Sequence, residues 1–124
     1  MIHLDTSFLV RALVAGTSQD RAVRAWLAAG EPLAMSAIAW AELLCGPIGA
    51  ADLDLVVRIV PDRAAFTEGD AALAARLFNE SGRRRGSLAD CMIAAAAIRT
   101  GASLATTNAR DFVRFEPAGL SLDG

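Results

Sequence analysis

Short apolar segments alternate along this chain with longer segments in which apolar residues recur every three or four positions. The first pair shows the pattern: Ile2 to Asp5 is apolar up to its final acid, and from Thr6 onward Phe8 and Leu9 begin a helical face that stops by Gly16. Strands that alternate with helices pair in parallel and are covered on both faces. The pattern therefore predicts an α/β fold with three layers, α/β/α, around a central parallel sheet.

The same criteria divide the rest of the chain into strands, helices and one conspicuous polar loop at 81–86. Ser36, Thr67 and Ser87 stand where helix N-caps are expected, and glycine or proline follows several of the helices. Further strands are predicted at 33–35, 64–66, 103–106 and 120–122. Further helices are predicted at 20–29, 37–45, 52–60, 68–79 and 88–99, with a single helical turn at 109–112. We find no repeat or linker, and expect one domain over 1–124.

Composition narrows the class of protein. The chain has 124 residues, of which 54% are hydrophobic, and its formal net charge is −2. It contains 27 alanines, and all twelve basic residues are arginine. This composition favours a compact, helix-rich domain and argues against intrinsic disorder. The mild acidity argues against a protein that coats DNA irrespective of sequence, but an enzyme with clustered acids and separate arginines stays possible.

Cysteine usage and hydropathy indicate a soluble protein of a reducing compartment. Cys45 and Cys91 lie in apolar contexts without a nearby second ligand, so neither a disulfide framework nor a zinc site is expected. No signal peptide is visible at the amino terminus. The longest apolar run, Cys91 to Ile98, is too short to cross a bilayer. We expect a cytoplasmic location.

Two acids at the ends of predicted strands or on apolar helix faces are difficult to explain structurally. Asp5 follows the first strand, where it could equally be an N-cap. Glu42 shares a helix face with Ile38, Ala41 and Cys45. We favour a buried, functional Glu42, because charged side chains are seldom buried without a partner. The alternative is a solvent-exposed face, with the core at the following leucines.

Two further segments supply acids. Asp90 stands at the third position of a helix that is apolar all round, so it lies near the core; with Ser87 it also resembles a capping box. The dipole of that helix favours an ionised carboxyl there. Asn108 and Asp111 follow the strand at 103–106, where turn chemistry alone would account for them.

Together these four segments indicate a metal site. Two follow strands and two lie near helix starts, which in a parallel sheet can converge on one edge. Carboxylates that share a small pocket repel one another unless a cation neutralises them. Oxygen ligands without cysteine or histidine suit Mg²⁺ or Mn²⁺, and such ions suit phosphate chemistry.

The motifs resemble those of a known family. They are Met1-Ile-His-Leu-Asp-Thr-Ser7, Ser36-Ala-Ile-Ala-Trp-Ala-Glu-Leu43, Ser87-Leu-Ala-Asp-Cys-Met-Ile-Ala94 and Leu104-Ala-Thr-Thr-Asn-Ala-Arg-Asp-Phe112. Their order and spacing resemble those of PIN-domain nucleases, most closely the VapC-type ribonuclease toxins of bacterial toxin–antitoxin pairs. The resemblance extends from Ile2 to about Phe115.

The resemblance implies a site and an activity. Asp5, Glu42 and Asp90 match the acids that hold the metal, chiefly Mg²⁺, in these nucleases. The family often has an acid where this chain has Asn108, so Asp111 would supply the charge and Asn108 would be a neutral ligand or support. Thr6 and Ser7 match small hydroxyl residues beside the first acid. The implied reaction is hydrolysis of an RNA phosphodiester, in which the metal activates water and stabilises charge on phosphorus.

The remaining polar and aromatic residues are assigned more simply. Arg83, Arg84 and Arg85 form either a solvated loop or a contact for RNA phosphate or for an acidic stretch of the antitoxin. His3, the only histidine, is interpreted as structural. The tryptophans at 26 and 40, with the phenylalanine at 78, are interpreted as core residues because they follow helical apolar spacing.

Three functions are compatible with these residues. The first is a Mg²⁺-dependent endoribonuclease toxin, which by resemblance pairs with a small antitoxin and forms a homodimer. The second is a catalytically weak PIN-like module that acts through protein partners, which Asn108 favours. The third is a structure-specific DNA nuclease, which the small size of the chain disfavours.

Overall fold

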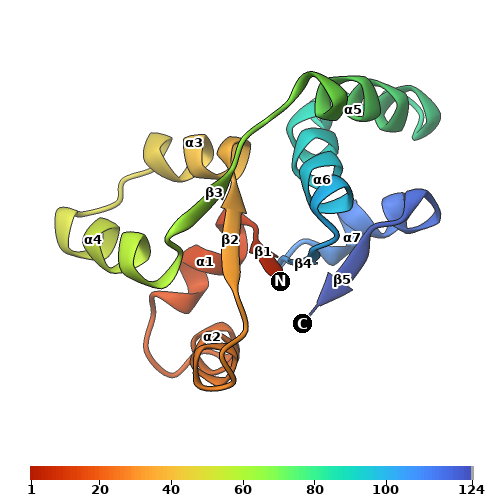
Figure 1. Ribbon diagram of the computed structural model, residues 1–124. Helices are drawn as coiled ribbons and strands as arrows, with labels where there is room; N and C mark the ends of the chain where they lie inside the picture. Colours follow the sequence, from red (N-terminus) through yellow and green to blue (C-terminus); the bar gives the residue numbers. More distant parts are fainter. Residues whose placement is uncertain (124) are drawn as a thin grey trace.

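The computed structural model describes residues 1–123 and contains one five-stranded sheet, all of whose pairings are parallel (Figure 1). The strand order is β3-β2-β1-β4-β5, so β1 lies at the centre. The order follows the chain outward from β1 in both directions, which is the arrangement that short crossovers through helices produce. The strands are β1 (Ile2–Leu4), β2 (Leu33–Ser36), β3 (Asp62–Ala64), β4 (Ser103–Ala105) and β5 (Ser121–Asp123).

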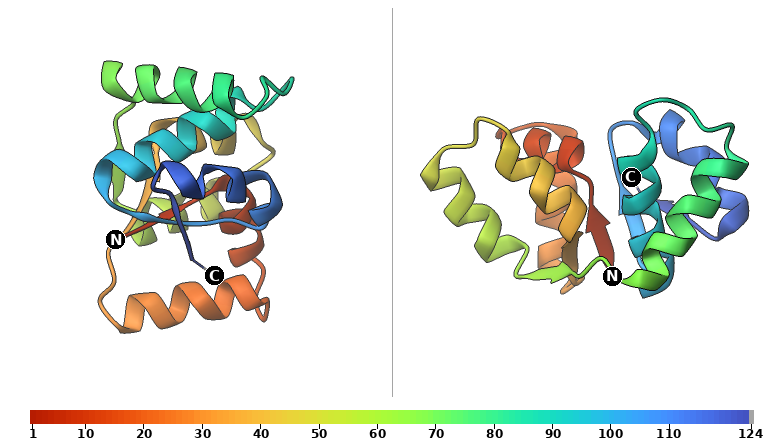
Figure 2. Two further views of the ribbon diagram at one scale, coloured as in Figure 1. Left: turned by 90° about the vertical axis from the view of Figure 1, so that its right-hand side faces the viewer. Right: turned by 90° about the horizontal axis from the view of Figure 1, so that it is seen from above.

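Seven α helices within residues 1–123 flank this sheet, which confirms the predicted three-layer α/β/α architecture. In Figure 1, α1 to α4 lie on one side of the strands, and α5, α6 and α7 lie on the other; Figure 2 shows the same division from above. The helices are α1 (Thr6–Ala12), α2 (Ser18–Ala28), α3 (Ala37–Cys45), α4 (Ala50–Ile59), α5 (Glu68–Glu80), α6 (Leu88–Thr100) and α7 (Ala109–Phe112), followed by the 3-10 helix η1 (Val113–Ala118).

The boundaries differ from the sequence predictions mainly at turns. The third strand lies at Asp62–Ala64 rather than at 64–66, because its backbone pairs with β2 before the chain leaves the sheet. The segment at 113–118, for which no element was predicted, is 3-10 helical and ends at Gly119, whose φ of 112° ends the helix in the left-handed region.

Helix caps account for several of the predicted starts. Ser36 Oγ accepts a hydrogen bond from the Ala39 amide at 3.1 Å, and Thr67 forms a reciprocal capping box with Asp70. The expectation of a capping box at Ser87 is wrong. Ser87 occupies the N-cap position of α6, but its backbone is helical and its hydroxyl donates instead to the Arg84 carbonyl at 2.7 Å. The hydroxyl therefore closes the preceding loop.

The core is built around β1, β2, β4 and α6. Every residue of β1 and β2 is buried, as expected for strands with helices on both faces. Helix α6 buries Cys91 and Ile93 together with four consecutive alanines at 94–97. Their small side chains let α6 approach both its neighbour α5 and the sheet closely. The two tryptophans and Phe78 are partly buried and pack against this core, as predicted.

An ion pair with a buried carboxylate and an exposed arginine lies at the opposite end of α6 from Asp90, together with a buried histidine. Asp70, which is 1% exposed, accepts a hydrogen bond from Arg99 Nε at 2.6 Å. His3 lies within β1, buried, with its Nε2 3.3 Å from the Thr100 hydroxyl, which supports its structural assignment. Both cysteines are free, Cys45 exposed and Cys91 buried. Within residues 1–123, no helix is long and apolar enough to cross a membrane.

Candidate metal and nuclease site

The four acidic segments lie along the carboxyl edge of the sheet. Asp5 follows β1, Glu42 lies on the helix that follows β2, and Asp111 lies on the helix that follows β4. Asp90 occupies the first turn of α6, which runs back to the start of β4. Parallel strands present their carboxyl ends at one edge, so residues distant in sequence become neighbours there. The charges of these acids influence one another, as described below.

Asp5 is the most firmly held of the four. It is 5% exposed, and its carboxylate accepts three hydrogen bonds. Oδ1 accepts from the Thr6 amide at 2.9 Å, which makes Asp5 the N-cap of α1. Oδ2 accepts from the Thr106 hydroxyl at 2.8 Å and from the Ser7 hydroxyl at 3.1 Å. The N-cap and site interpretations of Asp5 therefore apply together, because one oxygen caps the helix and the other faces the ends of the strands.

Thr106 is a member of the site that sequence reasoning missed. It is buried directly after β4; its hydroxyl donates to Asp5, and its Oγ1 accepts from the Asn108 amide at 3.0 Å. The parallel pairing of Leu4 with Ala105 brings Thr106 beside Asp5. A signal was present in the sequence, since a strand that ends in two threonines next to the acid-bearing turn places a hydroxyl at the same edge.

Thr6 and Ser7 support the first acid in different ways. The Thr6 hydroxyl donates to the Ala39 carbonyl at 2.7 Å and so links α1 to α3. Ser7 Oγ contacts both Asp5 and Thr106, and it accepts from the Thr107 amide at 3.3 Å. Thr6 therefore orients the helix bearing Glu42, whereas Ser7 belongs to the network that holds the Asp5 carboxylate.

The prediction of a buried Glu42 is wrong: the side chain is exposed on the outer part of α3. The core face of this helix consists of Ala39 and Leu43, and the next leucine, Leu44, is also exposed. Partial desolvation nevertheless raises the pKa of Glu42, and the charges of Asp5 and Asp90 raise it further. Glu42 thus faces the other acids from the solvent side of the site.

Asp90 occupies a half-buried position at the start of α6. Desolvation raises its pKa most, and the charges of Asp5 and Asp111 add to that rise. Arg114 and Arg84 act in the opposite direction and lower the pKa of Asp90. The pKa of Asp90 is therefore influenced in opposite directions by the acids and by the arginines of this edge.

The last two predicted residues differ in position. Asp111 is half-buried on α7, close enough to Asp90 to raise its pKa. Asn108 is exposed at the N-cap position of α7, but its side chain makes no capping hydrogen bond there. Of the two, Asp111 is the one that contributes negative charge to Asp90.

The donor chemistry of this edge fits a hard divalent cation, because four carboxyl groups lie along it and influence one another, and arginine offsets their repulsion only in part. The side chains are not preassembled into a metal-binding site. Among residues 1–123, no three His, Cys, Asp or Glu side chains are grouped so that they could hold a metal ion. Asp5 is fixed by its hydrogen bonds, so coordination would require rotation of the exposed Glu42 and the half-buried Asp90 and Asp111.

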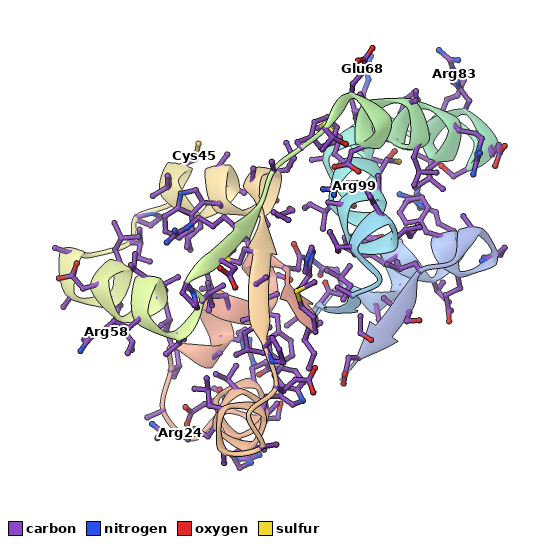
Figure 3. All side chains as sticks on the ribbon, viewed as in Figure 1. Arg24, Cys45, Arg58, Glu68, Arg83 and Arg99 are labelled. Carbon is purple, nitrogen blue, oxygen red and sulfur yellow. The ribbon has the colours of Figure 1, made fainter. Side chains whose placement is uncertain are left out.

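Arginines border the site on its α5–α6 side. In the loop at 81–86, Arg83 turns outward at the end of α5 and its Nη1 donates to Asn79 Oδ1 at 2.7 Å (Figure 3). Arg84 and Arg85 are exposed, and only Arg84 influences Asp90. Arg114 on η1 also influences Asp90, and sequence reasoning did not identify it. The three loop arginines therefore do not act as one group.

The opposite side of the site is apolar. A pocket of about 300 Å³ opens between α1, α3 and the start of α4, and Thr6 and Glu42 form its border with the acids. Most of its wall is aliphatic, contributed by Val10, Leu13, Val14, Leu43, Pro47 and Ile48. Val10 and Val14 are about half exposed. The acidic edge thus lies between an aliphatic surface and a cationic one.

A central parallel sheet with carboxylates converging at its carboxyl edge defines an α/β protein with a candidate site for metal-assisted phosphoryl chemistry. The family model for the PIN domain matches residues 2–116. The chain belongs to the PIN-domain family, a family of nucleases, which confirms the resemblance found in its motifs. No significant match is found among curated protein sequences.

Several solved structures share the fold over nearly the whole chain. VapBC2 from Rickettsia felis, bound to a DNA fragment from its promoter, is 25% identical with a TM-score of 0.78, covering 99% of this chain and 98% of that one. FitAcB from Neisseria gonorrhoeae is 25% identical with a TM-score of 0.70, covering 100% and 97%. VapBC-5 from Mycobacterium tuberculosis, of the VapBC family of toxin–antitoxin systems, is 25% identical with a TM-score of 0.62, covering 98% and 95%.

Proposed function

We propose that this chain is the toxin of a toxin–antitoxin pair, of the VapC type, and that it hydrolyses RNA phosphodiester bonds with Mg²⁺ as cofactor. The main support is the position of the acids along one sheet edge, where desolvation raises the pKa of Glu42 and Asp90 and the charge of Asp5 raises both further. Mn²⁺ would satisfy the same oxygen ligands. We propose one nuclease domain over 1–124, located in the cytoplasm, where its RNA substrate is found.

In this proposal Asp5, Asp90, Glu42 and Asp111 hold the metal, which supplies an activated water and stabilises negative charge on phosphorus. Asp5 provides a fixed point, because three hydrogen bonds hold its carboxylate. Ser7 and Thr106 keep that carboxylate oriented, and Thr6 ties α1 to the helix that bears Glu42. Asn108 would assist as a neutral oxygen donor.

The antitoxin is proposed from the solved relatives, which are toxin–antitoxin complexes. The aliphatic pocket beside Glu42 offers a surface of the right character for a helix of a small partner protein. A partner bound there would lie against the acids and restrict access to them. We also propose a homodimer, which the resemblance implies.

The decisive experiment measures cleavage of single-stranded RNA by the purified chain with Mg²⁺, with EDTA, and in the variants Asp5→Asn and Asp90→Asn. We expect EDTA to abolish cleavage and each variant to reduce it by orders of magnitude, because each removes a charged ligand. The control is Asp54→Asn, which removes one negative charge in the same way at an exposed position on α4. Full activity in both site variants would refute the proposal. Single-stranded DNA and flap substrates assayed in parallel would reveal a deoxyribonuclease instead.

An alternative function is a PIN-like module that binds protein partners without efficient cleavage. The observation in its favour is the absence, among residues 1–123, of three preassembled metal-binding side chains, together with the neutral Asn108. Calorimetric titration with Mg²⁺ and Mn²⁺ separates the two functions. Saturable binding that Asp90→Asn weakens supports the nuclease, whereas lack of binding supports the module.

A further inference from the structure

Two of the three guanidinium nitrogens of Arg114, Nε and Nη1, are shielded from solvent without a hydrogen-bond partner within the described residues 1–123. The central carbon of this guanidinium lies 4.7 Å from the centre of the Phe115 ring, so the flat group rests on an aromatic face. Buried polar groups are nearly always partnered, and one that is not calls for an ion, a water or a ligand as explanation.

The surroundings of Arg114 indicate the charge of such a ligand. Arg114 lines a pocket of about 510 Å³ between the end of α5 and η1. The pocket also contains Arg76 and Glu80, whose Nε and Oε1 are 3.8 Å apart, so these two charges offset each other. Arg114 therefore leaves the pocket with a net positive charge, and an anion is the ligand that this charge favours.

The location of the pocket relates it to the acids. On its wall, Glu80 ends α5 and Ser81 begins the loop at 81–86, and that loop leads into the first turn of α6, where Asp90 lies. Arg114 is close enough to Asp90 to lower the pKa of that carboxyl, as is Arg84 of the loop. Arg114 thus lies between the proposed metal site and a pocket of nucleotide dimensions.

We propose that Arg114 binds a phosphate of the RNA strand next to the scissile one, with the neighbouring nucleotide in the pocket between α5 and η1. This inference rests on the proposed ribonuclease function. A planar guanidinium can donate two parallel hydrogen bonds to one phosphate, which a lysine cannot do, and the shielded Nε or Nη1 would have to turn toward the pocket to complete such a pair. Arg114 is then a substrate-binding residue that sets the direction of the strand across the acids, on the side away from the aliphatic pocket.

The test measures RNA binding rather than cleavage. A short fluorescent single-stranded RNA is titrated in EDTA at several salt concentrations, against the wild type, Arg114→Gln, Arg114→Lys and the control Arg58→Gln. Arg58 is an exposed arginine on α4, remote from the pocket (Figure 3). We expect Arg114→Gln to weaken binding about tenfold or more, since a hydrogen bond to a charged group is lost. The slope of log affinity against log salt should fall by about 0.7, as for one lost phosphate contact.

Arg114→Lys should keep the salt slope, because the charge remains, but should bind less tightly because the paired hydrogen bonds are lost. Thermal unfolding shows whether each variant folds. If Arg114→Gln does not fold, the RNA affinity of Arg114→Lys still tests whether Arg114 binds phosphate. In the wild type, the NMR signal of the Arg114 Nε–H group should shift when RNA is added. Unchanged affinity in the folded Arg114 variants, or an unshifted signal on RNA binding, would overturn the inference.

The outcome for Arg114 is separable from that for the nuclease. If the protein cleaves RNA and Asp5→Asn abolishes cleavage, while the Arg114 variants bind RNA as the wild type does, the inference fails and the proposed function stands. If the wild type binds no RNA, both fail. Weaker binding by the Arg114 variants with normal binding by Arg58→Gln supports both.

Discussion

The Thr106 hydroxyl donates to Asp5 Oδ2 at 2.8 Å across 101 positions of sequence and joins the ends of the two central strands, β1 and β4. The bond is buried, and Ser7 Oγ completes a triangle with the same two groups. A carboxylate held in this way presents a constant geometry to a ligand, which is the requirement for a preorganised site.

Thr106→Val should therefore weaken both the fold and the site. Valine preserves the shape but leaves an Asp5 oxygen with one hydrogen bond fewer, so we expect a loss of about 1–2 kcal/mol in the free energy of unfolding. Cleavage of RNA should fall more than binding of RNA, because Asp5 loses orientation rather than charge. Urea unfolding and single-turnover cleavage measure the two effects. Thr106→Ser should restore both, and failure of serine to do so would contradict the role of the hydroxyl.

Neutralising an acid of the cluster should make the protein more stable. The pKa of Asp90 is raised in the folded state, so ionised Asp90 destabilises that state at neutral pH, and stability falls as pH rises through the folded pKa. We expect Asp90→Asn to stabilise the metal-free protein by roughly 0.5–2 kcal/mol at pH 7. The gain should shrink as pH falls and disappear below the unfolded pKa of about 3.9, where the wild-type carboxyl is protonated in both states.

Glu42→Gln should behave in the same direction, since its pKa is raised as well. Thermal unfolding with and without Mg²⁺ provides the measurement. The metal should raise the melting temperature of the wild type more than that of either variant, because a ligand stabilises the folded state by RT ln(1 + [L]/Kd), which is larger for tighter binding. Asp54→Asn should leave both quantities unchanged, and a stabilisation of equal size in that control would assign the effect to net charge alone.

Asp111 and Asn108 should contribute unequally to cleavage. Asp111 acts on Asp90 through its charge, whereas the Asn108 side chain is exposed and only its backbone amide bonds to Thr106. We expect Asp111→Asn to reduce cleavage by at least about tenfold, the factor for 1.4 kcal/mol of transition-state stabilisation. Asn108→Ala should stay within a few-fold of the wild type. The opposite ranking in initial-rate measurements would make Asn108 the fourth ligand.

The buried carboxyl at the other end of α6 should govern stability at acidic pH. Burial raises the pKa of Asp70, but the hydrogen bonds from Arg99 and Thr67 outweigh it, and the net pKa is lowered. A lowered pKa means that the stabilisation is complete above the unfolded pKa of about 3.9 and is lost as pH falls through the folded pKa.

Asp70→Asn should therefore cost about 1–3 kcal/mol at pH 7, with a difference from the wild type that shrinks below pH 4. Denaturant unfolding over that pH range measures it. Glu68→Gln, an exposed change in the same helical turn, is the matched control (Figure 3). A pH-independent difference for Asp70→Asn would assign the effect to packing rather than to the ion pair.

Local patterns were sufficient to predict the order of strands and helices and two of the helix caps. Apolar periodicity and capping residues act within a few positions of one another, so they can be recognised in a linear sequence. The four acidic segments were recognisable for the same reason, because each follows a strand or begins a helix. Their convergence followed from the rule that parallel strands end at one edge.

The exposure of a side chain and its hydrogen-bond partners in other elements could not be predicted in this way. Glu42 is exposed because α3 packs on Ala39 and Leu43, and the rotation of a helix about its axis depends on what it packs against. Ser87 does not cap α6 because the preceding loop brings the Arg84 carbonyl within reach of its hydroxyl. The ion pair of Asp70 with Arg99 joins α5 to α6, and it forms only when those two helices pack together.

The sequence by itself therefore determined the α/β architecture, the PIN-domain motifs and the set of acids at the sheet edge. Tertiary structure decided which side chains support and surround those acids. Thr106 reaches Asp5 only because Leu4 pairs with Ala105, and Arg114 influences Asp90 only because η1 continues from α7, which packs against α6. Strand register and helix packing are collective properties of the folded chain, since each depends on many distant contacts at once.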